Sequence, residues 1–242
     1  MEASLSGPAR PPPRDSMLRR TAFLFPVAIA IASPAAAQSA RDLLMDAAYS
    51  VPDKATALVR IDRALKAADA VLARDPRNLQ ARLSRAMAIS YRSKLGKSRS
   101  DALTSRREFE ALVAAHPNDA EAQMALAGWH LGAVIELGPL MARTALGARK
   151  GTGLQALKRA LALGGDRAMF PAFASLNQIQ IEPGNIAEAK RLAEAAVRAR
   201  APTQLDRIMQ RQAAILLRSL NAGNGQAAAR AAKTLSPFGR VR

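Results

Sequence analysis

The stretch AFASLNQIQIEPGNIAEAKRLAEAAVRARAP at residues 172–202 decides the fold of this chain. Two Ala-rich segments with apolar residues at helical spacing flank the turn Glu182-Pro183-Gly184-Asn185. The second segment stops at Ala201-Pro202-Thr203, and proline is common just beyond a helix end. The stretch therefore predicts a hairpin of two helices, over residues 168–181 and 186–200.

The same helix–turn–helix pattern occurs four times. The turns between units centre on Pro76, Pro117, Gly165 and Pro202, which are 41, 48 and 37 residues apart. Periods in this range are typical of stacked helical hairpins, because one hairpin cannot bury its apolar face without a neighbour. Aromatic residues make up only 4% of the chain, and small side chains let helix axes approach closely. We expect an all-α solenoid of about four helix pairs over residues 38–220.

The apolar spacing also predicts the bounds of the other helices. Asp53 stands where an N-cap is expected, just ahead of the periodic residues of a long helix. Residues 132–153 interrupt the third unit, and residues 221–242 are expected to form a short, basic and loosely held tail. The remaining expected helices cover residues 40–49, 54–74, 79–95, 101–115, 154–163 and 204–220, with one that starts at Ala120.

The N-terminal residues have the pattern of a signal peptide, from Met17 to Ala37. A basic start at 17–20 precedes an apolar run at 21–31, and Ala35-Ala36-Ala37 offers a cleavage site before Gln38. A spanning helix needs about 20 apolar residues, and this run is shorter. We expect export to the periplasm, with residues 1–16 a leader ahead of the true start; the alternative is an uncleaved anchor.

Charge and cysteine content narrow the possible functions. The formal net charge is +17, and 32 Lys and Arg against 17 Asp and Glu would remain after cleavage. In an exported protein this charge favours anionic envelope material or acidic proteins, and no aromatic-plus-basic motif indicates nucleic acid. The alternative is plain composition, since 28 of the 36 basic residues are Arg. The chain has no cysteine, which excludes disulfides, thiolate metal sites and cysteine nucleophiles.

The fourth unit resembles a tetratricopeptide (TPR) repeat. The residues that match the large apolar, turn glycine, small and closing proline positions of that family are Leu176, Gly184, Ala189, Ala196 and Pro202. The resemblance covers residues 54–220 as a pattern and 174–202 as a motif. With the signal peptide, the architecture is similar to exported bacterial TPR-like proteins, including the periplasmic accessory component of tripartite ATP-independent transporters. No transporter-specific residue carries over.

The resemblance implies a ligand groove, because TPR-like stacks bind partners along the first helix of each pair. That surface would be mostly apolar, which suits an extended peptide, an amphipathic helix or an acyl chain. The alternative is that several of its residues face neighbouring helices as ordinary core. The implied groove residues are Leu83, Met87, Ser90, Tyr91, Met124, Gly128, Leu131, Ala174, Gln178 and Ile181.

A second candidate site is the glycine-rich stretch 147–153. Backbone N–H groups there, together with Arg143, Arg149 and Lys150, could contact an anion at the start of the helix expected from Leu154. The stretch is not a phosphate-binding P-loop, because no GKS or GKT follows a strand. The alternative is an extra turn that covers the end of the helix pair.

The sequence gives little support for catalysis or metal binding. Trp129 and His130 are adjacent, so on a helix they cannot both face one pocket; we expect Trp129 to anchor the core and His130 to be a satisfied packing residue. Two separated histidines make a metal site improbable. No nucleophile motif such as GxSxG and no HExxH is present. We therefore expect no enzyme activity, cofactor or metal.

The function that these observations favour is non-catalytic. We expect an exported, periplasmic TPR-like protein that binds an acidic or amphipathic protein or peptide partner. One alternative is a lipid- or small-metabolite-binding accessory protein of an envelope transport system. Another is an envelope-attached structural protein, held by its basic surface to an anionic polymer or lipid.

Overall fold

The computed structural model describes residues 34–241, with only the backbone for residues 34–39. These residues form eleven α-helices and no strand, apart from an isolated bridge between Arg167 and Arg200. The expected all-α class is thus confirmed. The helices are α1 (Pro34–Tyr49), α2 (Lys54–Leu72), α3 (Leu79–Gly96), α4 (Arg99–Ala115), α5 (Ala120–Leu137), α6 (Pro139–Leu146), α7 (Lys150–Leu163), α8 (Met169–Ile181), α9 (Ile186–Arg198), α10 (Gln204–Asn221) and α11 (Gly225–Leu235).

The predicted signal peptide lies almost wholly outside the described residues. The basic start, the apolar run and the leader at 1–16 fall within residues 1–33. Helix α1 begins at Pro34, ahead of the expected cleavage before Gln38, so cleavage stays a prediction. In the part that is described, no single helix is both long and apolar enough to cross a membrane. The bent pair α5 and α6 meets that criterion only by combined length and composition.

Polar side chains define the starts of seven helices. In each, the residue before the helix accepts a hydrogen bond from a backbone N–H three residues later, which satisfies a donor that has no partner inside the helix. Asp53 does this for Thr56 N at 2.8 Å, as the sequence predicted. The other six capping residues are Asn78, Ser98, Asp119, Asn185, Thr203 and Asn224.

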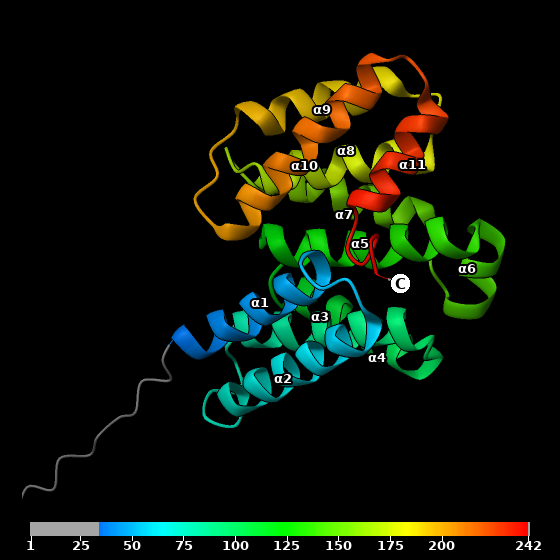
Figure 1. The fold of residues 1–242 in the computed structure, drawn as a ribbon. Coiled ribbons are helices and arrows are strands. Elements are labelled where there is room, and N and C mark those ends of the chain that lie inside the picture. Colours follow the sequence, from blue (N-terminus) through cyan, green and yellow to red (C-terminus); the bar gives the residue numbers. More distant parts are fainter. Residues whose placement is uncertain (1–33, 242) are drawn as a thin grey trace, which may run out of the picture. The chain divides into compact units, whose positions relative to one another are not determined.

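Consecutive helices pack against one another along the chain. α1 contacts α2, α2 contacts α3, and the pairs α3–α4, α5–α7 and α8–α9 are closely packed. Figure 1 shows α1 to α4 on one side of α5 and α8 to α11 on the other. Alanine makes the close approach possible: Ala189, Ala193 and Ala196 of α9 are all fully buried.

The third unit differs from the sequence expectation. Helix α5 continues through Gly132 to Leu137, and the break comes at Gly138, whose φ of 77° is in the left-handed region. Helix α6 follows from Pro139, and α7 starts at Lys150, four residues before the expected Leu154. The wrong boundary at Gly132 has a simple cause: an isolated glycine costs a helix only about 1 kcal/mol, which packing offsets.

The expectation of a loosely held tail at 221–242 was wrong. Residues 225–235 form α11, which packs on α8 and α10. Ala228, Ala232 and Leu235 lie at helical spacing and are buried, so they add apolar area to the same core. Beyond α11 the chain turns, and Phe238 is buried against the first hairpin.

Candidate functional site

A cavity of about 700 Å³, which we call the central cavity, lies among α1, α3, α5, α8, α10 and the end of the chain. Its volume is within the range of about 300–1,000 Å³ that small-molecule sites have. The wall is mainly apolar and contains five methionines, which adapt readily to partners of different shape. The lining residues lie within 41–49, 80–99, 102–109, 121–137, 145–146, 169–180, 205–209 and 233–241, and its methionines are Met45, Met87, Met124, Met169 and Met209.

Part of the expected groove lines this cavity. Residues from α3 and α5 do so as the resemblance implied: Leu83, Met87, Ser90, Tyr91, Met124 and Gly128. The remaining four do not line it. Leu131 is fully buried where α5 meets α7, and Ala174 is fully buried in the core. Gln178 donates to Glu182 Oε2 at 3.2 Å, and Ile181 packs on the core.

The prediction for α8 was wrong by one position along the helix. The residues of α8 that line the cavity include Phe173, Asn177 and Gln180, each one position before an expected residue. One position turns the helix surface by 100°, which moves Ala174 from the cavity into the core. Sequence reasoning also missed that α1, α10 and residues 236–241 line the cavity. A repeat pattern does not say which elements outside the repeats pack beside them.

Charged residues concentrate at two places in the central cavity. Beside α1, Arg41 pairs with Glu121 at 2.7 Å. At the other end, Lys94 pairs with Glu136 at 3.4 Å. Lys97, Arg99 and Lys233 also line the cavity, and among the described residues they form no ion pair. We call the group Lys94, Lys97, Arg99 and Lys233 the basic end; it leaves uncompensated positive charge beside an apolar surface.

A chain of four charged groups joins three helices near the cavity. Arg41 contacts Glu121, Glu121 contacts Arg167 at 2.8 Å, and Arg167 contacts Asp206 at 3.1 Å. Burial by itself would raise the pKa of Glu121 and of Asp206, but both pKa values are lowered. Hydrogen bonds and positive charge from the arginines outweigh burial at Glu121, and hydrogen bonds from Thr203 and the Met169 N–H, together with Arg167, outweigh it at Asp206. The network ties α1, α5 and α10 together and carries no net charge, so it serves structure.

Two tyrosines in the wall remain neutral. Burial raises the pKa of Tyr49 and of Tyr91 well above the ordinary value. The Tyr49 hydroxyl faces Met209 Sδ at 3.7 Å, and the Tyr91 ring meets Phe238 edge-to-face, with 4.9 Å between centroids. Both rings therefore act as apolar surface with a polar tip rather than as acids or bases.

Trp129 and His130 have different hydrogen-bond partners, although their rings meet edge-to-face with 5.0 Å between centroids. Trp129 lines the central cavity while its ring N–H donates to the Ala102 carbonyl at 3.1 Å. His130 is 2% exposed, and its Nδ1 accepts the backbone N–H of Arg149 at 3.2 Å, so it satisfies a donor at the start of α7. Its Nε2 is buried without a partner, which differs from the expected satisfied packing residue.

His130 should make the fold sensitive to mild acid. Burial, followed by the nearby Arg106 and Arg149 cations, lowers the pKa of His130 to about 4, and Glu110 opposes this only partly. The unfolded chain therefore binds a proton between about pH 6.5 and 4 that the folded chain refuses, so stability is full above this window and falls within it. We expect the free energy of unfolding to drop by about 2 kcal/mol from pH 7 to pH 5.

Urea denaturation at both pH values checks this expectation. The experiment is done in a His116→Gln background, which leaves His130 as the only histidine. The further change His130→Gln should remove most of the difference between pH 7 and pH 5. An equal difference with and without His130 would contradict the assignment.

Two of the groups expected to contact an anion are already bound within the protein. The Arg149 N–H is bound to His130, and Lys150 Nζ is bound to Glu182 Oε1 at 2.6 Å. Arg143 and Arg149 have exposed side chains, and none of the three cations lines the central cavity or the smaller cavity beside residues 236–241. Arg143, Arg149 and Lys150 are therefore close in sequence, but they do not line either of the two cavities.

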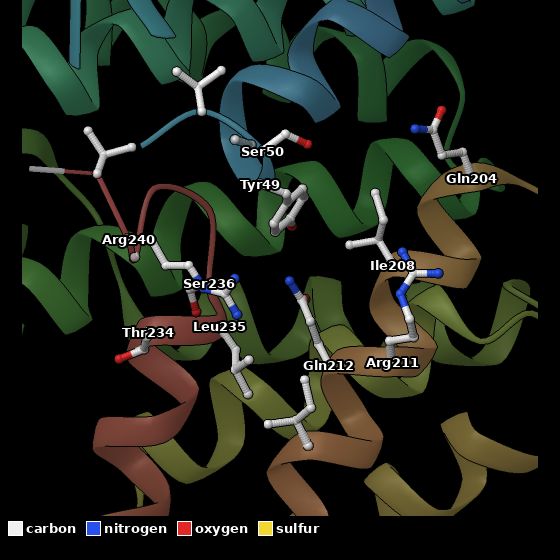
Figure 2. Close-up of a pocket in the computed structure, with 15 residues that line it drawn as sticks. Tyr49, Ser50, Gln204, Ile208, Arg211, Gln212, Thr234, Leu235, Ser236 and Arg240 are labelled. Carbon is white, nitrogen blue, oxygen red and sulfur yellow. The ribbon is translucent and has the colours of Figure 1, made fainter. Parts of the chain in front are cut away.

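That smaller cavity, the side pocket, has a volume of about 280 Å³ and lies on the other side of residues 236–241 from the central cavity. Tyr49, Ser236, Gly239 and Val241 line both cavities, so they form the wall between them. Figure 2 shows Tyr49 and Gln212 pointing toward each other across the side pocket, with Arg211 and Arg240 nearby. The segment after α11 therefore divides what would otherwise be neighbouring spaces.

In the described residues, no group of three or more His, Cys, Asp or Glu side chains is arranged to hold a metal ion. The arrangement is an apolar cavity with one basic end. No protein-family model, curated protein or solved structure matches this sequence.

Proposed function

We propose that this chain is a non-catalytic, exported TPR-like protein that binds a segment of a protein partner in the central cavity. The observation that carries the proposal is the central cavity itself, with its apolar, methionine-containing wall and the basic end. Such a surface fits a peptide or helix with an apolar face, and the cations favour acidic partners. The packed helix pairs and the buried Ala189 and Ala196 support the TPR-like reading.

Gly132 offers a way to block the cavity without damaging the fold. It lines the central cavity, and a Cβ built on it meets nothing within 4 Å. Gly132→Leu should keep or raise the free energy of unfolding, by up to about 1 kcal/mol, because leucine favours a helix interior over glycine. Its side chain would enter the cavity and exclude a partner. Gly151→Leu is the matched control, since that position is equally open but lies on α7 outside the cavity.

Site-specific photo-crosslinking in intact cells tests the proposal. A photoreactive residue at Ser90, inside the cavity, is compared with one at Val59, which is 52% exposed on α2. We expect one dominant protein crosslink from Ser90 and none from Val59, reduced at least tenfold by Gly132→Leu and unchanged by Gly151→Leu. N-terminal sequencing of the same sample should find a start at Gln38. Equal crosslinks in both Gly variants would contradict binding in the cavity.

A second candidate function is a carrier of an anionic amphiphile, such as a lipid or an acyl metabolite. The cavity volume of about 700 Å³ beside the cations Lys97, Arg99 and Lys233 favours it. An amphiphile would place its chain against the methionines and its anionic group at the basic end. Native mass spectrometry of the purified protein would show a bound ligand mass that Gly132→Leu removes; a protein with no extra mass would contradict this candidate.

A further inference from the structure

The turn at residues 236–241 that follows α11 packs against α1 and α3 and supplies part of the wall of the central cavity. The Phe238 side chain is buried, and its ring contacts Tyr91, one of the expected groove residues. The Phe238 N–H donates to the Ala48 carbonyl at 2.9 Å, and the Pro237 carbonyl accepts from Lys94 Nζ at 3.4 Å. An aromatic anchor with main-chain hydrogen bonds on both sides is how a docked peptide is held.

Two features show that this occupant is not the best one for the site. Phe238 has a φ of 63°, and the left-handed region is unfavourable for a residue other than glycine. The segment also brings no carboxylate to Lys97 or Lys233, and its one charged side chain, Arg240, is a cation that lines the side pocket. A peptide with the same anchor, an unstrained backbone and an acidic group would fit better.

We propose that residues 236–241 are an internal occupant of a peptide site, and that the partner is a peptide that displaces them. This peptide presents an aromatic side chain at the place of Phe238 and an acidic residue at the basic end. The inference rests on the proposed function, because it names the chemistry of the partner for the same cavity. Displacement would also remove Ser236, Gly239 and Val241 from the wall between the central cavity and the side pocket, while Tyr49 of α1 would stay in place.

The test uses the chain's own sequence as the probe. One synthetic peptide covers residues 235–241 with Pro237→Glu, because Pro237 lines the central cavity and its carbonyl lies 3.4 Å from Lys94 Nζ; a second carries Phe238→Ala in addition. Binding to the full chain and to its Phe238→Ala variant is measured by calorimetry and by the fluorescence of Trp129, the only tryptophan, which lines the cavity. We expect the first peptide to bind the Phe238→Ala chain at least tenfold more tightly than the full chain. The second peptide should bind neither.

Salt and sequence controls separate the two parts of the proposal. The unaltered 235–241 peptide should bind the Phe238→Ala chain at least threefold more weakly than the peptide with Pro237→Glu. That difference should shrink in 0.5 M salt, where charges are screened within about 3–5 Å. Equal binding to the full and variant chains, or binding that does not need the aromatic residue, would overturn the proposal.

Further outcomes distinguish failure of this inference from failure of the proposed function. The fluorescent dye 1-anilinonaphthalene-8-sulfonate, which joins apolar rings to an anionic sulfonate, is tested on the same proteins and on Gly132→Leu. If the dye binds the Phe238→Ala chain and Gly132→Leu blocks it, but no peptide binds, the peptide inference fails and the cavity still binds apolar ligands. If neither binds, both fail. If the Phe238→Ala chain and a chain ending at Leu235 both unfold, the segment is part of the core and the inference is overturned.

Discussion

Replacing Asp206 with alanine will lower the free energy of unfolding by about 3–5 kcal/mol, as expected when one partner of a buried ion pair is removed. Asp206 is 0% exposed and accepts hydrogen bonds from Arg167, from the Met169 N–H at 3.2 Å and from the Thr203 hydroxyl at 2.6 Å. Alanine would leave these donors without their acceptor, and it would remove half of the capping box that starts α10. Urea denaturation at pH 7 measures the loss.

Two control variants identify which contact dominates. Asp206→Asn keeps an oxygen that can accept the Met169 N–H but removes the charge that faces Arg167, so we expect an intermediate loss. Thr203→Ala removes only a capping hydroxyl and should cost about 1 kcal/mol. A loss below about 1 kcal/mol for Asp206→Ala would mean that water replaces the carboxylate, and would contradict the structural role of the network.

The same carboxylate should also shape stability at low pH. The pKa of Asp206 in the folded chain lies below its ordinary value of 3.8. The unfolded chain therefore takes up the proton first, and the stability from this group is present above the unfolded pKa and is lost as pH falls through the folded pKa. Below about pH 4 the wild-type chain should lose stability more steeply than Asp206→Ala. This window lies below that of His130, so the two effects can be measured separately.

Replacing Gly153 with valine should be the second most damaging change, with a loss at or above the upper end of the usual range of about 1–3 kcal/mol for overpacking. A Cβ at Gly153 would lie 2.5 Å from Leu131 Cδ2 and 2.7 Å from Leu131 Cγ. Leu131 is fully buried, so its side chain has no free space to move into. Helices α5 and α7 would have to separate, and urea denaturation would report the cost.

The chain provides a control two residues away on the same helix. A Cβ at Gly151 meets nothing within 4 Å, and we expect Gly151→Val to change the free energy of unfolding by less than about 0.5 kcal/mol. A similar loss at both positions would show that something other than contact with Leu131 sets the cost at Gly153, because valine is more favourable than glycine in a helix interior.

These stability effects bear on the central cavity because the same helices form its wall. Helix α5 supplies Met124, Gly128 and Trp129 on one face, while Leu131 and His130 pack on α7 behind it. The contact at Gly153 thus fixes the distance of the cavity wall from the core. A Gly153→Val chain that stays folded at low temperature should therefore also show altered Trp129 fluorescence.

The hairpin fold followed from short sequence patterns. Local chemistry decides where helices begin and end: Asp53, Asn185 and Thr203 cap helices wherever the chain places them, because each bonds to its own neighbouring N–H groups. Alanine and leucine at helical spacing predicted which face of each helix is buried. For this reason the all-α class and most helix bounds could be read from the sequence.

The cavity could be read only in part. Leu83, Met87, Tyr91, Met124 and Gly128 line it as expected. The prediction for α8 was wrong by one position, which corresponds to 100° around the helix axis. A repeat motif does not define the orientation of a helix that finely. The expected tail failed for another reason: Ala228, Ala232 and Leu235 are an ordinary amphipathic pattern that gains stability only once α8 and α10 stand beside it.

The sequence by itself therefore determined the helices, their caps, their order and the small residues that let them pack. Only the tertiary structure decided which segments line the central cavity. Tyr91 and Phe238 are 147 positions apart in the chain, and Lys94 and Lys233 are 139 positions apart, yet all four meet at one cavity. Such contacts depend on how several helices stack, and local interactions along the chain do not determine that arrangement.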